Sequence, residues 1–179
     1  MESTTKATAV LLIFAQYGFR KSSMSDIAHA VGLSRQSIYN QFGSKEAVLD
    51  WTINTFLSNV TEEAVQTLQE AEGLPEKVLS NAFQIWIGNH VPIWRGTPHG
   101  AEILELAIDS AGRASTDFEE TFSNAVSSFL LSSGLSQNAS EAKDMTYVMN
   151  LASKGLMLKC QTSEAYTTGM LRVLRTLFP

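Results

Sequence analysis

Apolar side chains recur at helical spacing along almost the whole chain, and no stretch alternates apolar and polar residues in the way a strand does. The first stripe, from Val10 to Tyr17, falls at positions i, i+3, i+4 and i+7. Only four prolines and eleven glycines interrupt the 179 residues. The pattern therefore predicts an all-α fold of about nine helices.

The helix boundaries follow from capping and breaking residues. Gly18 and Gly32 are expected to end helices, Ser23, Ser34 and Ser44 to begin them, and Pro75 to occupy a first turn. The apolar stretch Val91–Pro98 is expected to be a loop. The first helix is expected to end at Gly18. The later helices are expected to cover roughly residues 24–31, 34–42, 44–68, 76–90, 99–111, 117–133, 140–160 and 163–178.

Composition excludes several classes of protein. The net charge of -5 argues against a general polyanion binder. A single cysteine, Cys160, rules out an internal disulfide and a multi-cysteine zinc site, and the three histidines have no partners at metal-ligand spacing. No cofactor and no metal are therefore expected. No apolar stretch is long enough to span a bilayer and the N-terminus lacks a signal-peptide layout, so we expect a cytoplasmic protein without a membrane partner.

Residues 24–42 have the pattern of a helix-turn-helix. Two short helices are joined by the tight turn Gly32–Ser34, and small Ala28 permits their close approach. The residues expected to lock the helices together are Ile27, Ala28, Val31, Leu33 and Ile38. The side chains left outward on the second helix are Arg35, Gln36, Ser37 and Asn40. All of them can hydrogen-bond to base edges or phosphate and none is acidic, so this face is suited to reading DNA in the major groove.

Local charge supports this interpretation. Residues 1–50 carry a net charge of +1, whereas the remainder carries -6. Lys45 stands at the start of a helix, where backbone amides also attract phosphate. Asp26 and Glu46 lie in helix first turns, where acidic residues are expected because of the helix dipole.

An ordered set of motifs extends over roughly residues 5–50. It comprises Gly18-Phe19, Ser23–Ala28, Val31–Ser34, Ile38-Tyr39, Phe42 and Ser44–Glu46. This set resembles the DNA-binding domain of TetR-like bacterial transcriptional regulators. The resemblance implies an N-terminal three-helix helix-turn-helix domain over residues 1–47, and a helical effector-binding and dimerisation domain over 48–179.

The same resemblance implies a homodimer on a near-palindromic, double-stranded operator, and a repressor that a small molecule releases. Carried over by position, it implies phosphate contacts by Tyr39 and Lys45, with Ser23 and Ser34 as further candidates. Arg35, Gln36 and Ser37 occupy the base-facing positions. A simple packing role remains the alternative for Tyr39, and Phe42 is expected in the core.

A pocket for an unidentified, largely hydrophobic effector is expected in the C-terminal part, because ligand pockets are mostly apolar with a few placed polar groups. The candidates are Phe83, Trp86, Ile87, His90, Trp94, Phe118, Phe122 and Met149, with Glu105 and Asp109 as polar anchors. The alternative is that each aromatic residue belongs to the core. His90 and His99 are expected at the surface, and Cys160 as a small buried apolar residue.

The last two helices are expected to form the dimer interface as the family implies, because each is apolar on more than one face. The candidates are Met145, Val148, Met149, Ala152, Leu156, Tyr166, Met170, Val173, Leu174 and Leu177. The alternative is that these stripes complete the core of one subunit.

Two other functions would leave different sequence patterns. An enzyme on a helical bundle needs paired carboxylates with Glu-x-x-His motifs or a nucleophile beside a base, and neither pattern is present. A helix-turn-helix that binds protein and no DNA predicts apolar or acidic residues where Arg35, Gln36, Ser37 and Asn40 stand. The sequence therefore favours a DNA-binding regulator without catalytic activity.

Overall fold

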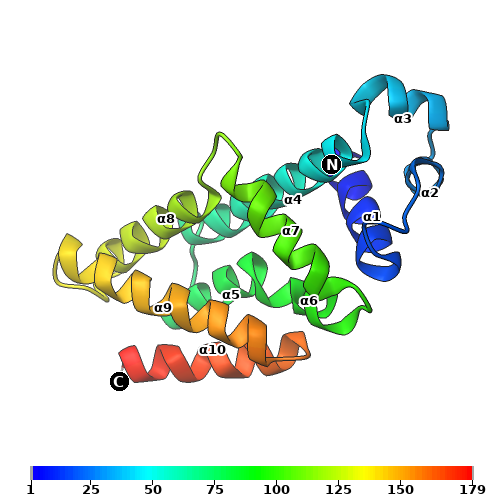
Figure 1. Cartoon of the computed structure of the whole chain (residues 1–179). Helices are drawn as coiled ribbons and strands as arrows, with labels where there is room; N and C mark the ends of the chain where they lie inside the picture. Colours follow the sequence, from blue (N-terminus) through cyan, green and yellow to red (C-terminus); the bar gives the residue numbers. More distant parts are fainter. Residues whose placement is uncertain (1, 179) are drawn as a thin grey trace. The chain divides into compact units, whose positions relative to one another are not determined.

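The computed structural model describes residues 2–178, and over this range the chain is helical with no strand (Figure 1). The all-α prediction is confirmed. None of the helices in this range is long and apolar enough to cross a membrane. The helices are α1 (Glu2–Tyr17), α2 (Met24–Ala30), α3 (Arg35–Phe42), α4 (Lys45–Gln69), α5 (Pro75–Trp86), the 3-10 helix η1 (Gly88–His90), α6 (Val91–Gly96), α7 (Gly100–Gly112), α8 (Phe118–Ser132), α9 (Ala139–Lys159) and α10 (Ser163–Leu177).

The prediction of a loop over Val91–Pro98 was wrong, because Val91–Gly96 forms the short helix α6. Pro92 is the second residue of α6, where its missing N–H costs no hydrogen bond. The last two helices were expected to begin at residues 140 and 163, and their caps lie just upstream of these positions. Asn138 caps α9 by accepting a 3.0 Å hydrogen bond from the Glu141 N–H, and Thr162 caps α10.

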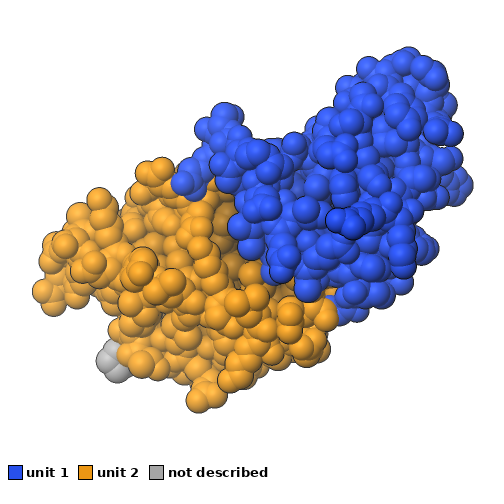
Figure 2. Space-filling model, viewed as in Figure 1, with its two compact units in different colours: residues 1–59, 96–117 blue, residues 60–95, 118–179 orange. Residues whose placement is uncertain are grey.

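The chain divides into two compact units (Figure 2). Unit 1 comprises residues 1–59 and 96–117, and so contains α1, α2, α3, the first part of α4, and α7. Three hydrogen bonds attach α7 and its N-cap within this unit. The His99 N–H donates to the Ala15 carbonyl (2.9 Å), and Ser110 and Arg113 donate to Asp50 Oδ1 (2.6 and 2.8 Å). A border at residue 47 would separate Ala15 from His99, which the first of these bonds joins. The functional border stays a prediction.

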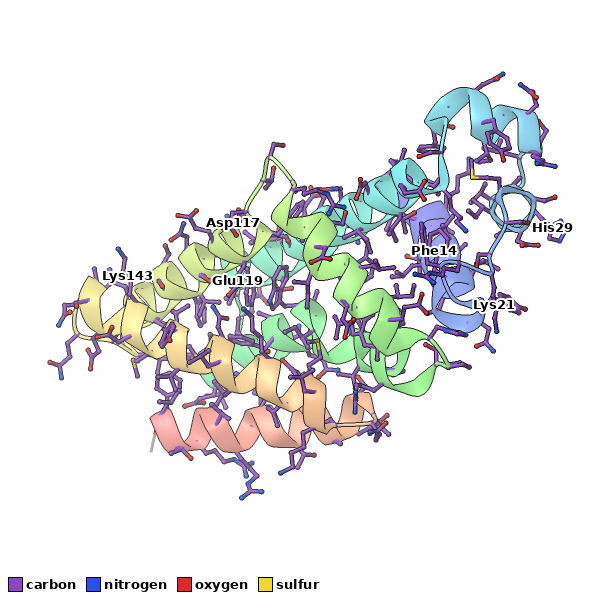
Figure 3. The ribbon with its side chains drawn as sticks, in the orientation of Figure 1. Phe14, Lys21, His29, Asp117, Glu119 and Lys143 are labelled. Atoms are coloured by element: carbon purple, nitrogen blue, oxygen red, sulfur yellow. The ribbon has the colours of Figure 1, made fainter. Side chains whose placement is uncertain are left out.

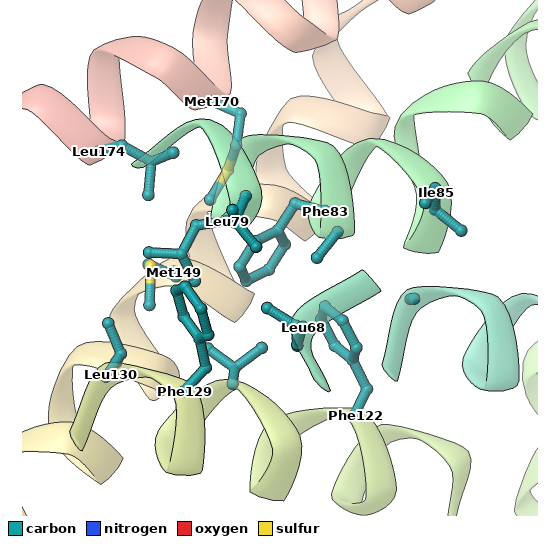
Figure 4. Packing of buried hydrophobic residues seen from close by; sticks show 14 of the residues in the cluster. Leu68, Leu79, Phe83, Ile85, Phe122, Phe129, Leu130, Met149, Met170 and Leu174 are labelled. Atoms are coloured by element: carbon teal, nitrogen blue, oxygen red, sulfur yellow. The ribbon is translucent and has the colours of Figure 1, made fainter. Parts of the chain in front are cut away.

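Unit 2 comprises residues 60–95 and 118–179 and contains a hydrophobic core cluster. Phe83 of α5 and Phe122 of α8 pack edge to face at 5.2 Å, and Met149 of α9 lies in the same cluster (Figure 4). Side-chain hydrogen bonds join α8 to α9 at four-residue intervals: Ser127 to Thr146 (2.9 Å), Asn150 to Ser123 (2.8 Å) and Lys154 to Glu119 (2.7 Å). This polar ladder sets the register of the two antiparallel helices.

Candidate nucleic-acid interface

The first helix of the motif, α2, is fixed at its N-terminus by a capping box. The Ser23 hydroxyl accepts a hydrogen bond from the Asp26 N–H (3.2 Å), and the Asp26 carboxylate accepts one from the Ser23 N–H (2.8 Å). The Ser23 hydroxyl also donates to Asp26 Oδ2 (2.7 Å). These hydrogen bonds hold the pKa of Asp26 below its usual value. Asp26 is thus committed to the cap, as its position in the first turn predicts.

The turn after α2 explains the glycine at position 32. The Gly32 N–H donates to the His29 carbonyl (3.2 Å), and the Leu33 N–H donates to the Ala28 carbonyl (2.9 Å). This pair of hydrogen bonds is a Schellman motif, which requires a left-handed residue at the position of Gly32. Gly32 has φ +68°, while no atom crowds the place of a Cβ, so backbone geometry alone selects glycine here.

The second helix, α3, begins at Ser34, whose hydroxyl accepts a 3.0 Å hydrogen bond from the Ser37 N–H. Ile38 faces inward and is only 2% exposed. The side chains predicted to face outward, Arg35, Gln36, Ser37 and Asn40, are all exposed. The orientation of this face is therefore confirmed, while its contact with bases stays a prediction.

The outward side chains are also connected to one another. The Gln36 amide donates to Asn40 Oδ1 (2.8 Å), one helical turn away. The Arg35 guanidinium lies over the ring of Tyr39, 5.4 Å from its centroid. Tyr39 is 39% exposed, so its phenol is available to solvent. These contacts restrict the rotamers of the face, which lowers the entropy lost when it binds a partner.

Lys45, at the start of α4, is held in place by the segment before α2. Its ammonium donates to the carbonyls of Ser22 (2.9 Å) and Arg20 (3.2 Å), and it lies 4.7 Å from the centre of the Phe19 ring. An ammonium has three donors, so one remains available. Ser44 caps the same helix by accepting from the Ala47 N–H (3.1 Å), as predicted.

A surface groove of about 410 Å³ brings these groups together. It contains four of the predicted DNA-binding residues, namely Ser23, Arg35, Tyr39 and Lys45. Ser25 and Ser44 also line it and were not predicted as contacts. Their signal in the sequence is their position at or near helix N-termini, where free amides and hydroxyls meet. The groove combines two cations with the hydroxyls of Ser23, Ser25 and Ser44 and no lining carboxylate, which is the chemistry of a phosphate site.

Lys21 and His29 are also exposed in unit 1 (Figure 3). Both line a second groove of about 640 Å³, together with Tyr17. Asp26 also lines this groove, so a carboxylate is part of its lining. We therefore assign the phosphate-binding chemistry to the groove of Arg35 and Lys45 only.

The predicted effector residues are distributed over both units. Phe83, Phe122 and Met149 are fully buried in the core of unit 2, and Trp86 stacks on Phe122 at 4.8 Å. Trp94 is buried, Ile87 and Phe118 are half-buried, and Glu105 and Asp109 are exposed on α7 in unit 1. The pocket stays a prediction, and the buried members contribute to the core.

His90 differs from its predicted place at the surface. Burial lowers its pKa to about 4, and its Nε2 lies 3.1 Å from the Ile85 carbonyl oxygen. His99 is half-buried: its Nδ1 lies 2.9 Å from Glu102 Oε2, and its ring packs on Gly18. Cys160 is half-buried, and no cluster of metal ligands is found among residues 2–178.

The predicted dimer residues separate into three groups by exposure. Met149, Tyr166, Met170 and Leu174 are 0% exposed and have no surface to offer a partner. Their helical stripe packs instead against the core of their own subunit, as the alternative predicted. Val148 is 46% exposed. The half-buried members are Met145, Ala152, Leu156, Val173 and Leu177.

Comparison with known proteins finds sequence similarity in the N-terminal segment of the chain. Residues 8–50 match the family model described as bacterial regulatory proteins of the tetR family. The chain is 36% identical over 70 residues to the HTH-type transcriptional regulator BetI of Agrobacterium fabrum, and 32% identical over 71 residues to the HTH-type transcriptional repressor DhaR of a Mycobacterium species. These matches cover 39% and 40% of this chain, and only 34% and 36% of the relatives' length.

Similarity of fold extends over the whole chain. A putative TetR-family regulator from Mesorhizobium loti superposes with a TM-score of 0.68, covering 98% of this chain and 94% of the other at 14% identity. A putative TetR-family regulator from a Rhodococcus species gives a TM-score of 0.67 at 16% identity, covering 99% and 98% of the two chains. The fold is therefore shared well beyond the segment in which the sequences are recognisably similar.

Proposed function

We propose that this chain, which has the TetR-type DNA-binding domain and fold, is a homodimeric transcriptional regulator that binds operator DNA by sequence. The observation that carries the proposal is the exposed face of α3, where Arg35, Gln36, Ser37 and Asn40 stand without an acidic neighbour. Arginine pairs with guanine, and glutamine or asparagine with adenine, in the major groove. The groove of Arg35 and Lys45 would hold the phosphate backbone beside that helix.

The alternatives have less support. A protein-binding helix-turn-helix needs an apolar or acidic outer face on α3, and this face is neutral or basic. An enzyme needs a nucleophile or carboxylate pair near a base. The chemistry of the outer face favours DNA over either alternative, and we infer no catalytic activity.

A dimer is part of the proposal because a near-palindromic site needs two recognition helices about 34–36 Å apart. The exposed apolar surface of α9 supports it: Tyr147, Leu151 and Leu158 are 65%, 53% and 57% exposed, with Val148 beside them. These residues recur at helical spacing on one face, and no atom lies within 4 Å of the Cβ position of Gly155 on the same face. We propose this face, rather than the buried stripe, as the centre of the interface.

The proposed mode of regulation is repression relieved by a small, largely hydrophobic effector in the cytoplasm. The relative DhaR is named a repressor, which supports the sign. A ligand that binds the splayed state of the dimer more tightly than the DNA-bound state would shift the population toward release. The half-buried aromatic residues Trp86 and Phe118 remain the first candidates for its pocket.

Selection from a random pool of duplex DNA tests the proposal. We expect enrichment of an inverted repeat whose half-sites are one helical turn apart. Arg35→Ala is expected to lose the preference at one base pair of each half-site, at a cost of about 1–3 kcal/mol. Recovery of no common sequence would contradict sequence-specific recognition.

A further inference from the structure

A groove of about 600 Å³ runs along the seam between α5 and α10 in unit 2. We call it the α5/α10 groove. Its volume lies within the range of about 300–1,000 Å³ that small-molecule sites occupy. None of the predicted effector residues lines it, and the DNA-binding groove belongs to the other unit. Neither the DNA-binding surface nor the predicted effector pocket accounts for it.

One part of the α5/α10 groove is apolar. Leu174 is fully buried and forms its floor, while Leu171 and Phe178 are half-buried along its side. Leu74, at the start of α5, is 58% exposed at its edge. Apolar surface left open in this way gains free energy when a hydrocarbon covers it, by about 25 cal/mol for each Å² buried.

The polar lining includes an engaged amide and a serine hydroxyl. The Gln84 amide is already engaged, since its oxygen accepts from Thr167 Oγ1 (2.6 Å) and its nitrogen donates to Asn89 (2.9 Å). Ser80 lines the groove as well and is only 8% exposed. Its hydroxyl can donate a hydrogen bond to a bound molecule.

The charged lining is net positive. Lys77 and Arg175 line the groove, and within residues 2–178 neither has an ion-pair partner. Glu76 is the single acid of the lining. The N-terminus of α5 lies there as well, with Leu74 as an N-cap that provides no side-chain hydrogen bond. The positive end of the α5 dipole therefore lies at the same end of the groove as Lys77.

We propose that the α5/α10 groove binds an amphipathic anion, a carboxylate with a hydrocarbon tail. The tail covers Leu171, Leu174 and Phe178, while the carboxylate lies between Lys77 and Arg175 and accepts a hydrogen bond from Ser80. This assignment follows from the coexistence of an apolar floor, two cations and a serine hydroxyl in one groove. It does not depend on the proposed DNA binding.

Calorimetric titration of the full-length protein with decanoate, below its micelle concentration and without DNA, tests this site. We expect one decanoate per chain and weaker binding of decanol. Lys77→Gln and Arg175→Gln are each expected to weaken decanoate about threefold, as loss of one exposed charge pair does. Glu76→Gln is expected to tighten it by a similar factor. Arg172→Gln is the matched control, because Arg172 is exposed on the same helix and does not line the groove.

Three results would overturn the proposal: no heat of binding with decanoate, equal effects of Arg175→Gln and Arg172→Gln, or decanol binding as tightly as decanoate. Sedimentation of Leu171→Ser tests whether a second copy of the chain occupies the groove instead. A shift to smaller species would show that it does. Arg35→Ala separates this proposal from the DNA-binding one. It is expected to leave the decanoate titration unchanged while it impairs operator binding.

Discussion

Asp50 of α4 accepts a 2.6 Å hydrogen bond from Ser110 of α7, across 60 positions of sequence. Arg113 donates to the same carboxylate oxygen at 2.8 Å. The hydrogen bond from Ser110, and then the charge of Arg113, hold the pKa of Asp50 below its usual value. Together with the bond from the His99 N–H to the Ala15 carbonyl, this contact attaches both ends of α7 within unit 1.

Ser110→Ala is expected to lower the free energy of unfolding by about 1 kcal/mol, because the carboxylate keeps its contact with Arg113 and with water. Urea denaturation measures the change. The loss is expected to be present at neutral pH and to shrink only as the pH falls through the depressed native pKa of Asp50, because protonation then removes the charged acceptor. Ser128→Ala, on the exposed side of α8, is the control. A loss of the same size when Asp50 is replaced by Asn would contradict the role of the carboxylate.

His90 predicts an acid sensitivity of its own. Its pKa is lowered to about 4 by burial, from an ordinary value of 6.5. Between pH 6.5 and 4 the unfolded chain therefore binds a proton at His90, whereas the folded chain does not. Stability that is present above pH 6.5 is lost as the pH falls toward 4. The expected loss reaches about 3 kcal/mol, at 1.36 kcal/mol for each pKa unit.

His90→Gln is expected to remove that part of the pH dependence, as followed by thermal unfolding between pH 4 and 8. The exposed His29→Gln is the control and is expected to leave the pH dependence in place. If His90→Gln unfolded with the same pH profile as the unmodified protein, the assignment to His90 would fail.

Tyr166 and Ser153 form a buried hydrogen-bonded pair in unit 2. Their hydroxyl oxygens lie 2.5 Å apart, and both residues are 0% exposed. Burial raises the pKa of Tyr166. Tyr166→Phe is expected to cost about 1–3 kcal/mol in urea unfolding, because it leaves the Ser153 hydroxyl without this partner. The double variant with Ser153→Ala is expected to recover part of that cost, and a double variant that is less stable than the single one would contradict the pairing.

The apolar face of α9 predicts the effect of a charge on assembly. Leu151→Arg places a cation among Tyr147, Val148 and Leu158, and is expected to convert a dimer to monomers in sedimentation analysis. Operator affinity is expected to fall with it, because one recognition helix alone spans half a site. Leu131→Arg, at a 46% exposed leucine of α8, is the control that preserves the dimer. Unchanged sedimentation of Leu151→Arg would place the interface elsewhere.

The helix-turn-helix was predictable because its signals are local. Ser23, Gly32 and Ser34 lie within twelve positions of one another, and each acts through hydrogen bonds to its own neighbours. The burial of His90 was not predictable in this way, because it depends on residues that pack around it from elsewhere in the chain.

The packing partners of the C-terminal helices could not be predicted from local sequence either. Helical periodicity identified the stripe of Met149, Tyr166 and Leu174, but it cannot say whether a stripe packs on its own subunit or on a partner. The attachment of α7 to unit 1 likewise depends on the contact of Asp50 with Ser110, two residues far apart in the sequence. Nothing in either local pattern indicates that contact.

The salt dependence of operator binding tests the central claim most directly. With the selected operator, we expect the logarithm of the binding constant to fall linearly with the logarithm of salt concentration. Lys45→Ala is expected to weaken all DNA sequences alike and to reduce the slope by about 1, whereas Arg35→Ala is expected to weaken the selected operator most. Thermal melts of both variants control for folding, because Lys45 also holds the carbonyls of Arg20 and Ser22. An affinity indifferent to salt, or identical behaviour of the two variants, would contradict the account.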